Sequence, residues 1–262
     1  MKKLFIFAIV ALGMLACTDK NAPSNPNAQN GALSGTFSVS ATKKVKFAQG
    51  NLQYQASTNT WRFAEHQYDI IGEDNANISE TYEGWIDLFA WGTGNNPTYE
   101  DAVETFVDWG VNAISNGGNQ PNLWRTLSCD EWKYLKNQRP NANYLMGLAN
   151  VCSREGIVIL PDEWQTPSNA HWSPTKMNFD INGYIENDWA IMESAGAIFL
   201  PCAGYRAGTK ITIVPAWTNY WLSTPTEEGG AYCFSWDGLG IYNPSSDGRF
   251  RGLPVRLVQD VK

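Results

Sequence analysis

The strongest constraint in this sequence is that its apolar residues occur in short runs, each soon interrupted by glycine or proline. Residues 156–164 (GIVILPDEW) carry four consecutive apolar side chains before a Pro-Asp turn, and residues 195–206 (AGAIFLPCAGYR) form a second apolar run that Pro201 ends. Runs of this length, bounded by turn residues, predict buried β-strands. Three further short strands, separated by long loops, are expected over residues 219–225, 231–236 and 249–258.

The first half of the chain has a different pattern, in which apolar and polar residues alternate over very short distances. Apolar side chains alternate with polar ones over residues 37–40, 45–47, 52–54 and 61–63, and turn residues lie at 50–51 and 57–59. Alternation with a period of two, punctuated by turns, predicts an antiparallel meander. Residues 68–94, rich in Gly, Asn, Asp and Trp, are expected to form long loops.

Two segments carry helix signals. Residues 98–110 predict a helix with Thr98 as N-cap and Gly110 as C-cap, with one apolar face formed by Ala102, Val103, Phe106 and Val107. Residues 124–135 (WRTLSCDEWKYL) contain Ser128 and Glu131 at the spacing of a capping box. We therefore expect a second helix that begins after Ser128 and presents Trp132 and Leu135 to the core.

The N-terminus has the organisation of an export signal. Lys2 and Lys3 precede an apolar run over residues 4–15, which is too short to cross a bilayer as a helix. The run closes on Met14-Leu15-Ala16-Cys17, which resembles a bacterial lipobox. We expect residues 1–16 to be a signal peptide, Cys17 to be lipidated, and residues 17–35 to be a flexible tether. The alternative is an ordinary signal peptide that happens to contain a cysteine. The lipobox places the protein in the outer membrane of a Gram-negative bacterium, at the cell surface or facing the periplasm.

Composition excludes several classes of protein. The chain has 262 residues, of which 13% are aromatic, and its net charge is −7. That aromatic content argues against intrinsic disorder, and a sequence pI near 4.9 argues against nucleic-acid binding. Loss of Lys2 and Lys3 with the signal would change the net charge to −9. Anionic lipid would repel so acidic a body, so we expect it to be held at the membrane by its acyl chains alone.

The order of the motifs at 124–135, 156–164, 195–206, 220–225 and 252–258 resembles that of the Fibrobacter succinogenes major paralogous domain. This family is related to the C-type-lectin-like fold, which formylglycine-generating enzymes and retroelement-diversified receptor proteins share. The similarity covers roughly residues 122–258. Its most specific pieces are Arg125-x-Leu127-x3-Glu131-Trp132 and Arg251-Gly252-x3-Arg256-Leu257-Val258.

The resemblance implies an α+β, C-type-lectin-like fold with short antiparallel strands, two or three helices and long loops, and with the N-terminal meander packed on it. We expect residues 36–262 to form a single body, in which 36–118 are a β-rich extension and 119–262 the lectin-like core. A separate N-terminal domain is the alternative. The variable surface of such a fold is formed by loops of the C-terminal half.

The catalytic and metal-binding signatures of related proteins are incomplete in this sequence. Formylglycine-generating enzymes depend on a pair of cysteines, whereas Cys233 stands alone in its segment. Calcium-dependent lectins use a Gln/Glu-Pro motif in the long loop, but Gln120-Pro121-Asn122 precedes the capped helix. The acidic cluster over residues 73–80 lacks the glycine of an EF-hand and is interpreted as a solvated loop, with a calcium site as the alternative. We expect no catalytic residues, no metal site and no cofactor.

The cysteines leave more than one pairing open. Cys129, Cys152, Cys202 and Cys233 permit two disulfides in an exported chain, and Cys202–Cys233 is one candidate bridge because both residues lie in or beside expected strands. Buried free thiols are the alternative. The chain contains no Cys-x-x-Cys, so neither a thioredoxin-like site nor a zinc ribbon is indicated.

Aromatic residues of the C-terminal loops are the main candidates for ligand contact. Flat rings stack on the apolar faces of sugars and also anchor protein interfaces, while amides and carboxylates bond ligand hydroxyls. The alternative for the strand residues Trp221 and Trp236 is that they fill the core. The predicted ligand-binding residues are Trp217, Asn219, Tyr220, Trp221, Trp236, Asp237, Tyr242 and Asn243.

The sequence therefore predicts a surface-anchored, non-enzymatic recognition lipoprotein that binds a glycan or protein ligand through its C-terminal loops. One alternative is a structural or assembly subunit of a surface or adhesive complex. A second is a carbohydrate-active hydrolase, which would need two carboxylates in a deep cleft.

Overall fold

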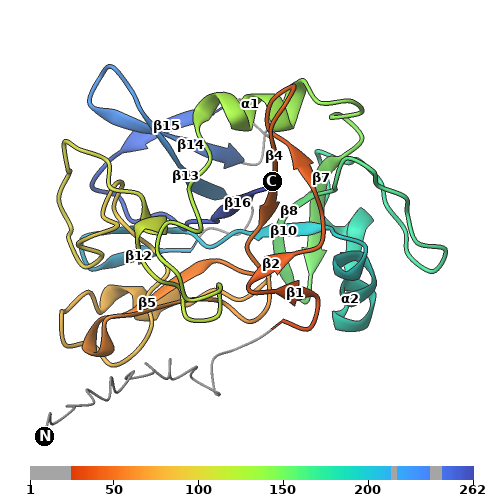
Figure 1. The fold of residues 1–262 in the computed structure, drawn as a ribbon. Helices are drawn as coiled ribbons and strands as arrows, with labels where there is room; N and C mark the ends of the chain where they lie inside the picture. Colours follow the sequence, from red (N-terminus) through yellow and green to blue (C-terminus); the bar gives the residue numbers. More distant parts are fainter. Residues whose placement is uncertain (1–24, 214–216, 237–243) are drawn as a thin grey trace, which may run out of the picture.

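Many small, mainly antiparallel sheets and two α-helices form the part of the chain that the structure describes (Figure 1). The structure is a computed structural model, and it describes residues 25–213, 217–236 and 244–262. This mixed architecture agrees with the predicted combination of short antiparallel strands, few helices and long loops. No helix among these residues is long and apolar enough to cross a membrane.

The sheets follow one another along the chain, except that the last strand returns to the first half. The strands are β1 (Ala28–Gln29), β2 (Ala32–Leu33), β3 (Phe37–Ser38), β4 (Lys44–Phe47), β5 (Leu52–Gln55), β6 (Thr60–Phe63), β7 (Met146–Val151), β8 (Arg154–Ile159), β9 (Gly183–Tyr184), β10 (Ile198–Pro201), β11 (Tyr205–Ala207), β12 (Lys210–Thr212), β13 (Thr218–Pro225), β14 (Gly230–Trp236), β15 (Ser245–Gly248) and β16 (Val258–Asp260). The helices are α1 (Cys129–Asn137) and α2 (Glu186–Ser194), with short 3-10 turns η1 (Ala56–Thr58), η2 (Gly72–Ala76), η3 (Trp109–Val111) and η4 (Asp180–Asn182).

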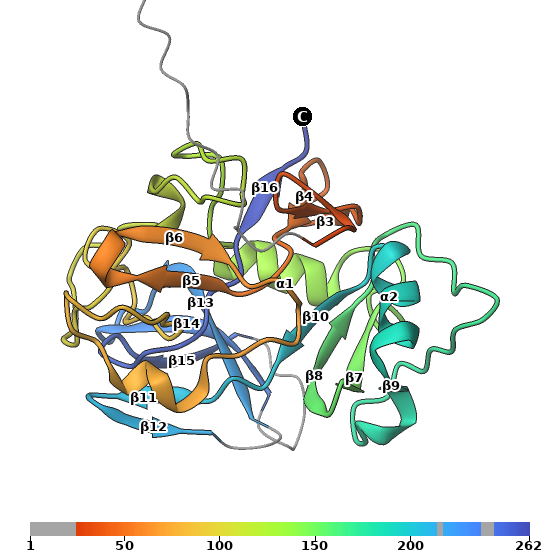
Figure 2. The same cartoon turned by 90° about the horizontal axis from the view of Figure 1, so that it is seen from below.

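The two apolar runs are buried strands, as predicted. They lie in one sheet of order β10-β8-β7-β9, in which only the short β7–β9 pair is parallel. Both faces of this sheet are covered. Ile157 and Ile159 face a core that also contains Trp132 of α1, whereas Val158 faces Trp189 of α2. Figure 2 shows α2 lying along the β7–β9 side of this sheet.

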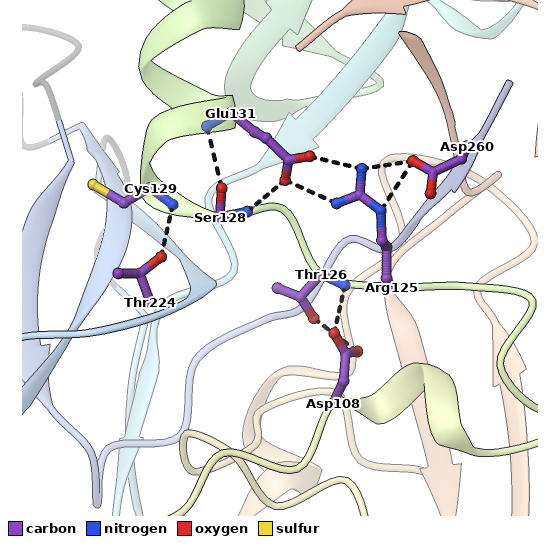
Figure 3. Close-up of polar contacts among 8 residues, drawn as sticks. All are labelled: Asp108, Arg125, Thr126, Ser128, Cys129, Glu131, Thr224 and Asp260. Atoms are coloured by element: carbon purple, nitrogen blue, oxygen red, sulfur yellow. Dashed lines mark hydrogen bonds and ion pairs between the residues drawn. The ribbon is translucent and has the colours of Figure 1, made fainter. Parts of the chain in front are cut away.

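Helix α1 begins where the capping box predicts. The Ser128 hydroxyl accepts a hydrogen bond from the Glu131 backbone N–H at 3.3 Å, and the Glu131 carboxylate accepts one from the Ser128 N–H at 2.9 Å. Trp132 and Leu135 are buried, as expected. The N–H of Cys129 donates to the Thr224 hydroxyl at 3.0 Å, which ties the start of the helix to β13 (Figure 3).

Arg125 joins α1 to the C-terminal strand. Its guanidinium bonds both carboxylate oxygens of Glu131 at 2.8 Å and reaches Asp260 at 2.6 Å (Figure 3). The backbones of Arg125 and Val258 also exchange hydrogen bonds of 3.0 and 2.9 Å. These contacts hold together the two sequence motifs on which the family resemblance depends.

The meander of the first half is divided, and this corrects the prediction. β3 pairs with β4, and β5 pairs with β6, but β4 has β16 as its other neighbour, with Phe47 opposite Val258. The chain turns away between Phe47 and Leu52, where a Cβ at Gly50 would lie 2.5 Å from the Ala64 carbonyl oxygen. The alternating pattern located the strands correctly, but it does not say which strands pair.

Residues 25–35 were predicted to belong to a flexible tether, and the structure corrects this. They form the hairpin β1–β2, and Leu33 is fully buried in the hydrophobic core that also contains Trp132 of α1. The side-chain amides of Asn25 and Asn27 donate to the Glu193 carboxylate of α2 at 3.0 and 2.8 Å. Residues 17–24, including the candidate lipidation site Cys17, lie outside the described residues.

The predicted helix over residues 98–110 is absent, and only the 3-10 turn η3 forms at its end. Tertiary contacts take the backbone groups that a helix would pair. Arg249 donates to the carbonyls of Val103 and Glu104 at 3.2 Å, and the Val107 N–H bonds Gly92. Val103 and Phe106 still pack against the core, whereas Ala102 of the predicted apolar face is exposed, so the pattern identified the buried positions in part and their conformation not at all.

Candidate ligand pocket on the C-terminal sheet

Three of the predicted ligand-binding residues are core residues. Tyr220, Trp221 and Trp236 are at most 3% exposed. The Trp221 indole donates to the Phe89 carbonyl at 2.8 Å, and the Tyr220 hydroxyl lies 3.1 Å from both Asn51 Oδ1 and the Pro201 carbonyl oxygen. Trp236 packs edge-on against another aromatic ring, that of Phe179. Burial therefore removes these three residues from the set of ligand contacts.

The other predicted residues divide into two groups. Asp237, Tyr242 and Asn243 lie outside the described residues. Trp217 and Asn219 lie together at the start of β13, where they line a hollow of about 350 Å³. Its other lining residues come from β14, β15 and the turn that follows, namely Ser235, Ser245, Ser246, Asp247 and Arg251.

Strand register explains why these residues meet. Asn219 is opposite Ser235 in the β13–β14 pair, and Cys233 is opposite Ser245 in the β14–β15 pair. Side chains directly opposite in an antiparallel pair, and those two positions along, share a face of the sheet. Asn219, Ser235 and Ser245 are consequently on one face, to which Asp247, opposite Ala231, also belongs.

Asn219 is the most informative residue of the pocket. The residue is only 7% exposed, and its side-chain carbonyl oxygen Oδ1 has no hydrogen-bond partner among the described residues. Burying an acceptor without a partner costs about 1–3 kcal/mol, so native proteins seldom tolerate one. Asn219 thus lines the hollow with a side chain whose acceptor capacity is unused among the described residues.

One side of the pocket is an ion pair supported by two aromatic rings. Arg251 Nε lies 3.0 Å from Asp247 Oδ1, which also accepts the Gly248 N–H at 2.7 Å. Partial burial raises the pKa of the Asp247 carboxyl above its usual value, although the Gly248 hydrogen bond and Arg251 oppose this shift. The Arg251 guanidinium lies 4.6 Å from the centre of the Tyr205 ring, and this ring meets Trp217 edge-on at 5.2 Å.

Sequence reasoning found only part of this pocket. In the sequence Arg251 belongs to a motif and Tyr205 to an apolar run, and neither pattern predicts contact with a ligand. The serines and Asp247 carried no signal, because the sequence SSDG of β15 is typical of an ordinary turn. Only the pairing of β15 with β14 brings them beside Trp217 and Asn219.

In the acidic cluster over residues 73–80, Glu73, Asp74 and Glu80 are exposed, and of its polar residues only Asn75 turns into the protein. Asn75 is buried, donates to the Asp87 carboxylate at 2.8 Å, and accepts the N–H groups of Asp87 and Leu88. Among the residues with described positions, no group of three or more His, Cys, Asp or Glu side chains could hold a metal ion. A broad hollow of about 740 Å³ lies nearby, over residues 76–83, but none of the buried polar atoms identified without a partner belongs to its lining.

The candidate disulfide does not form. Cys202 and Cys233 are both buried, and no disulfide joins any two of the four described cysteines. Burial strongly raises the pKa of the Cys233 thiol, so this sulfur is held in its protonated, unreactive form.

Comparison with known proteins found no matching family model, no matching curated protein and no matching solved structure.

Proposed function

We propose that this protein is a non-enzymatic recognition lipoprotein that binds a carbohydrate in the pocket of the β13–β15 sheet. The observation that carries the proposal is that Asn219 lines a cavity while its buried Oδ1 has no hydrogen-bond partner among the described residues. Sugars are rich in hydroxyl donors, and one of these would satisfy that oxygen. The exposed part of Trp217 supplies a flat apolar surface for the ring of the same sugar.

The dimensions and chemistry of the pocket favour this ligand over the alternatives. A hollow of about 350 Å³ is at the small end of ligand sites, which suits a short saccharide better than a protein surface. Glycoside hydrolysis uses two carboxyl groups about 5–10 Å apart. Among the described lining residues, Asp247 is the one carboxylate, so the pocket supports binding more directly than hydrolysis.

We also propose that the fold is C-type-lectin-like and that the chain resembles the Fibrobacter succinogenes major paralogous domain in more than local motifs. The paired backbone hydrogen bonds between Arg125 and Val258 support this, because they join the two most specific pieces of the resemblance. The β4–β16 pair supports the proposal that residues 36–262 are one body, since it joins the N-terminal extension to the end of the core.

The test is binding of the full-length protein, in detergent micelles, to a broad array of immobilised glycans. We expect binding to a restricted set, and a loss of about tenfold in affinity for Asn219→Ala and for Trp217→Ala, the loss that one hydrogen bond or one stacked ring accounts for. Trp164→Ala is the matched control, because this half-buried indole packs against a different hydrophobic cluster, the one that contains Trp189 of α2. An array with no bound glycan, or unchanged affinity in both pocket variants, would refute the proposal.

A further inference from the structure

The charges and hydrogen-bonding groups of the pocket also restrict which carbohydrates it can accept. Two of its polar groups are fixed as acceptors, namely Asn219 Oδ1 and the carboxylate of Asp247. Both described contacts of this carboxylate fall on Oδ1, which leaves Oδ2 able to accept a hydrogen bond from a ligand. The serine hydroxyls that complete the lining can either donate or accept.

The one cation of the described lining is already engaged. Arg251 directs its Nε to Asp247 at 3.0 Å, and its guanidinium carbon lies over the Tyr205 ring, 4.6 Å from the ring centre. Its positive charge is therefore neutralised by a carboxylate that lines the same cavity. A ligand carboxylate or sulfate that approached Arg251 would also approach Asp247.

The partial burial of Asp247 makes that approach more unfavourable. Burial already disfavours its ionised form, with the Gly248 N–H and Arg251 acting in the opposite direction. A second anion in the same partly dehydrated hollow would add like-charge repulsion, and juxtaposed like charges suppress binding strongly.

We infer, resting on the proposed function, that the pocket selects an uncharged sugar over its acidic counterpart. The sugar presents one hydroxyl to Asn219 Oδ1 and another to the carboxylate of Asp247, while an apolar face of its ring lies against Trp217. Uronic acids and sulfated sugars are excluded by Asp247. The ion pair with Arg251 is thus the specificity-determining element of the site.

Replacing Asp247 by asparagine should reverse this preference. In Asp247→Asn the repulsive charge disappears and Arg251 loses its ionic partner, so its guanidinium becomes available to a ligand anion. The variant should bind acidic sugars about tenfold more tightly than the wild type does, and neutral sugars more weakly. Asp188→Asn is the matched control, because Asp188 is an exposed carboxylate on α2.

The experiment compares neutral oligosaccharides with uronic-acid counterparts of the same linkage, using titration calorimetry on the full-length protein in micelles. Binding of the neutral member, with the acidic member at least about tenfold weaker, supports the inference. Equal or tighter binding of the acidic member by the wild type overturns the inference and leaves the carbohydrate function standing. If neither class binds, the proposed function and the inference fail together. Thermal melting of each variant verifies that it is folded.

Discussion

Arginine side chains hold the interior of this protein together by bonding to carbonyl oxygens more than to carboxylates. Arg256 is almost fully buried, and its guanidinium donates to Asn51 Oδ1 at 2.9 Å and to the Phe199 carbonyl at 3.0 Å. Burial lowers its pKa to about 10, so the group remains charged at neutral pH. Arg206 is completely buried and bonds the carbonyls of Leu88 and Gly208. These contacts join segments that are far apart in the sequence, since Arg256 bonds Asn51 and Phe199 and Arg206 bonds Leu88.

Asp87 should make the protein less stable at neutral pH than in mild acid. Its carboxylate is fully buried, with Asn75 and the Ile71 N–H as its donors, and burial raises its pKa from 3.8 to about 6. Because the folded state then binds the proton more tightly, the group favours folding below pH 3.8. This contribution disappears as the pH rises through about 6. This rise in the pKa of Asp87 corresponds to about 3 kcal/mol of unfolding free energy.

The comparison that tests this is urea unfolding of the wild type and Asp87→Asn between pH 4 and pH 8. The variant cannot ionise at this position, so its free energy of unfolding should lack the decrease, centred between pH 4 and 6, that Asp87 gives the wild type. Asp188→Asn, an exposed control, should follow the wild type. Parallel pH profiles for wild type and Asp87→Asn would contradict the assignment.

The sequence pattern predicts where β13 and β14 lie in the chain, but it does not predict which of their side chains are exposed. Alternation identified β13 and β14 correctly, but it could not indicate which face contacts ligand, because both faces of this pair are buried. Tyr220 and Trp236 face one core, while Trp221 and Cys233 face another. In such a layer, alternate residues of each strand point into two different cores. The residues that reach the cavity lie where β13 begins, such as Trp217 and Asn219.

At the scale of elements, α1 shows a local signal that tertiary contacts reinforce. The capping box fixes where the helix begins, and the same Glu131 that closes it also receives Arg125. The predicted helix over residues 98–110 had caps and an apolar face as well, but contacts from Arg249 and Gly92 take its backbone groups. A sequence pattern predicts a helix or strand reliably when the polar groups of that segment and the residues that contact it in the fold favour the same conformation.

Ser128→Ala should therefore reduce the free energy of unfolding by about 1 kcal/mol, because the Glu131 N–H loses its side-chain acceptor at the first turn of α1. Urea titration followed by circular dichroism measures the change. Ser57→Ala, at an exposed serine within η1, is the control and should shift the midpoint very little. A Ser128→Ala midpoint equal to that of the control would show that the cap contributes nothing.

At the scale of the whole molecule, the N-terminal segment is a fixed part of the body. Glu193 of α2 accepts hydrogen bonds from the side chains of Asn25, Asn27 and Gln67, at 2.8 to 3.0 Å. Because residues 25–35 belong to the body, the predicted tether is reduced to residues 17–24. Eight residues span about 28 Å at most when fully extended. Figure 1 shows β1–β2 at the lower side of the molecule and β13–β15 at the upper left, and no residue of the β1–β2 hairpin lines the pocket.

This arrangement predicts that membrane attachment and ligand binding can be separated by mutation. If Cys17 carries the lipid, Cys17→Ala should move the protein from the membrane fraction to the soluble fraction, since the acidic chain has no attraction of its own for anionic lipid. Its glycan affinity should stay unchanged, because no residue of the β1–β2 hairpin, which follows the tether, lines the pocket. Trp217→Ala should do the opposite, remaining in the membrane fraction while losing affinity. Fractionation and glycan binding of both variants measure this, and membrane retention of Cys17→Ala would disprove the lipid anchor without affecting the pocket.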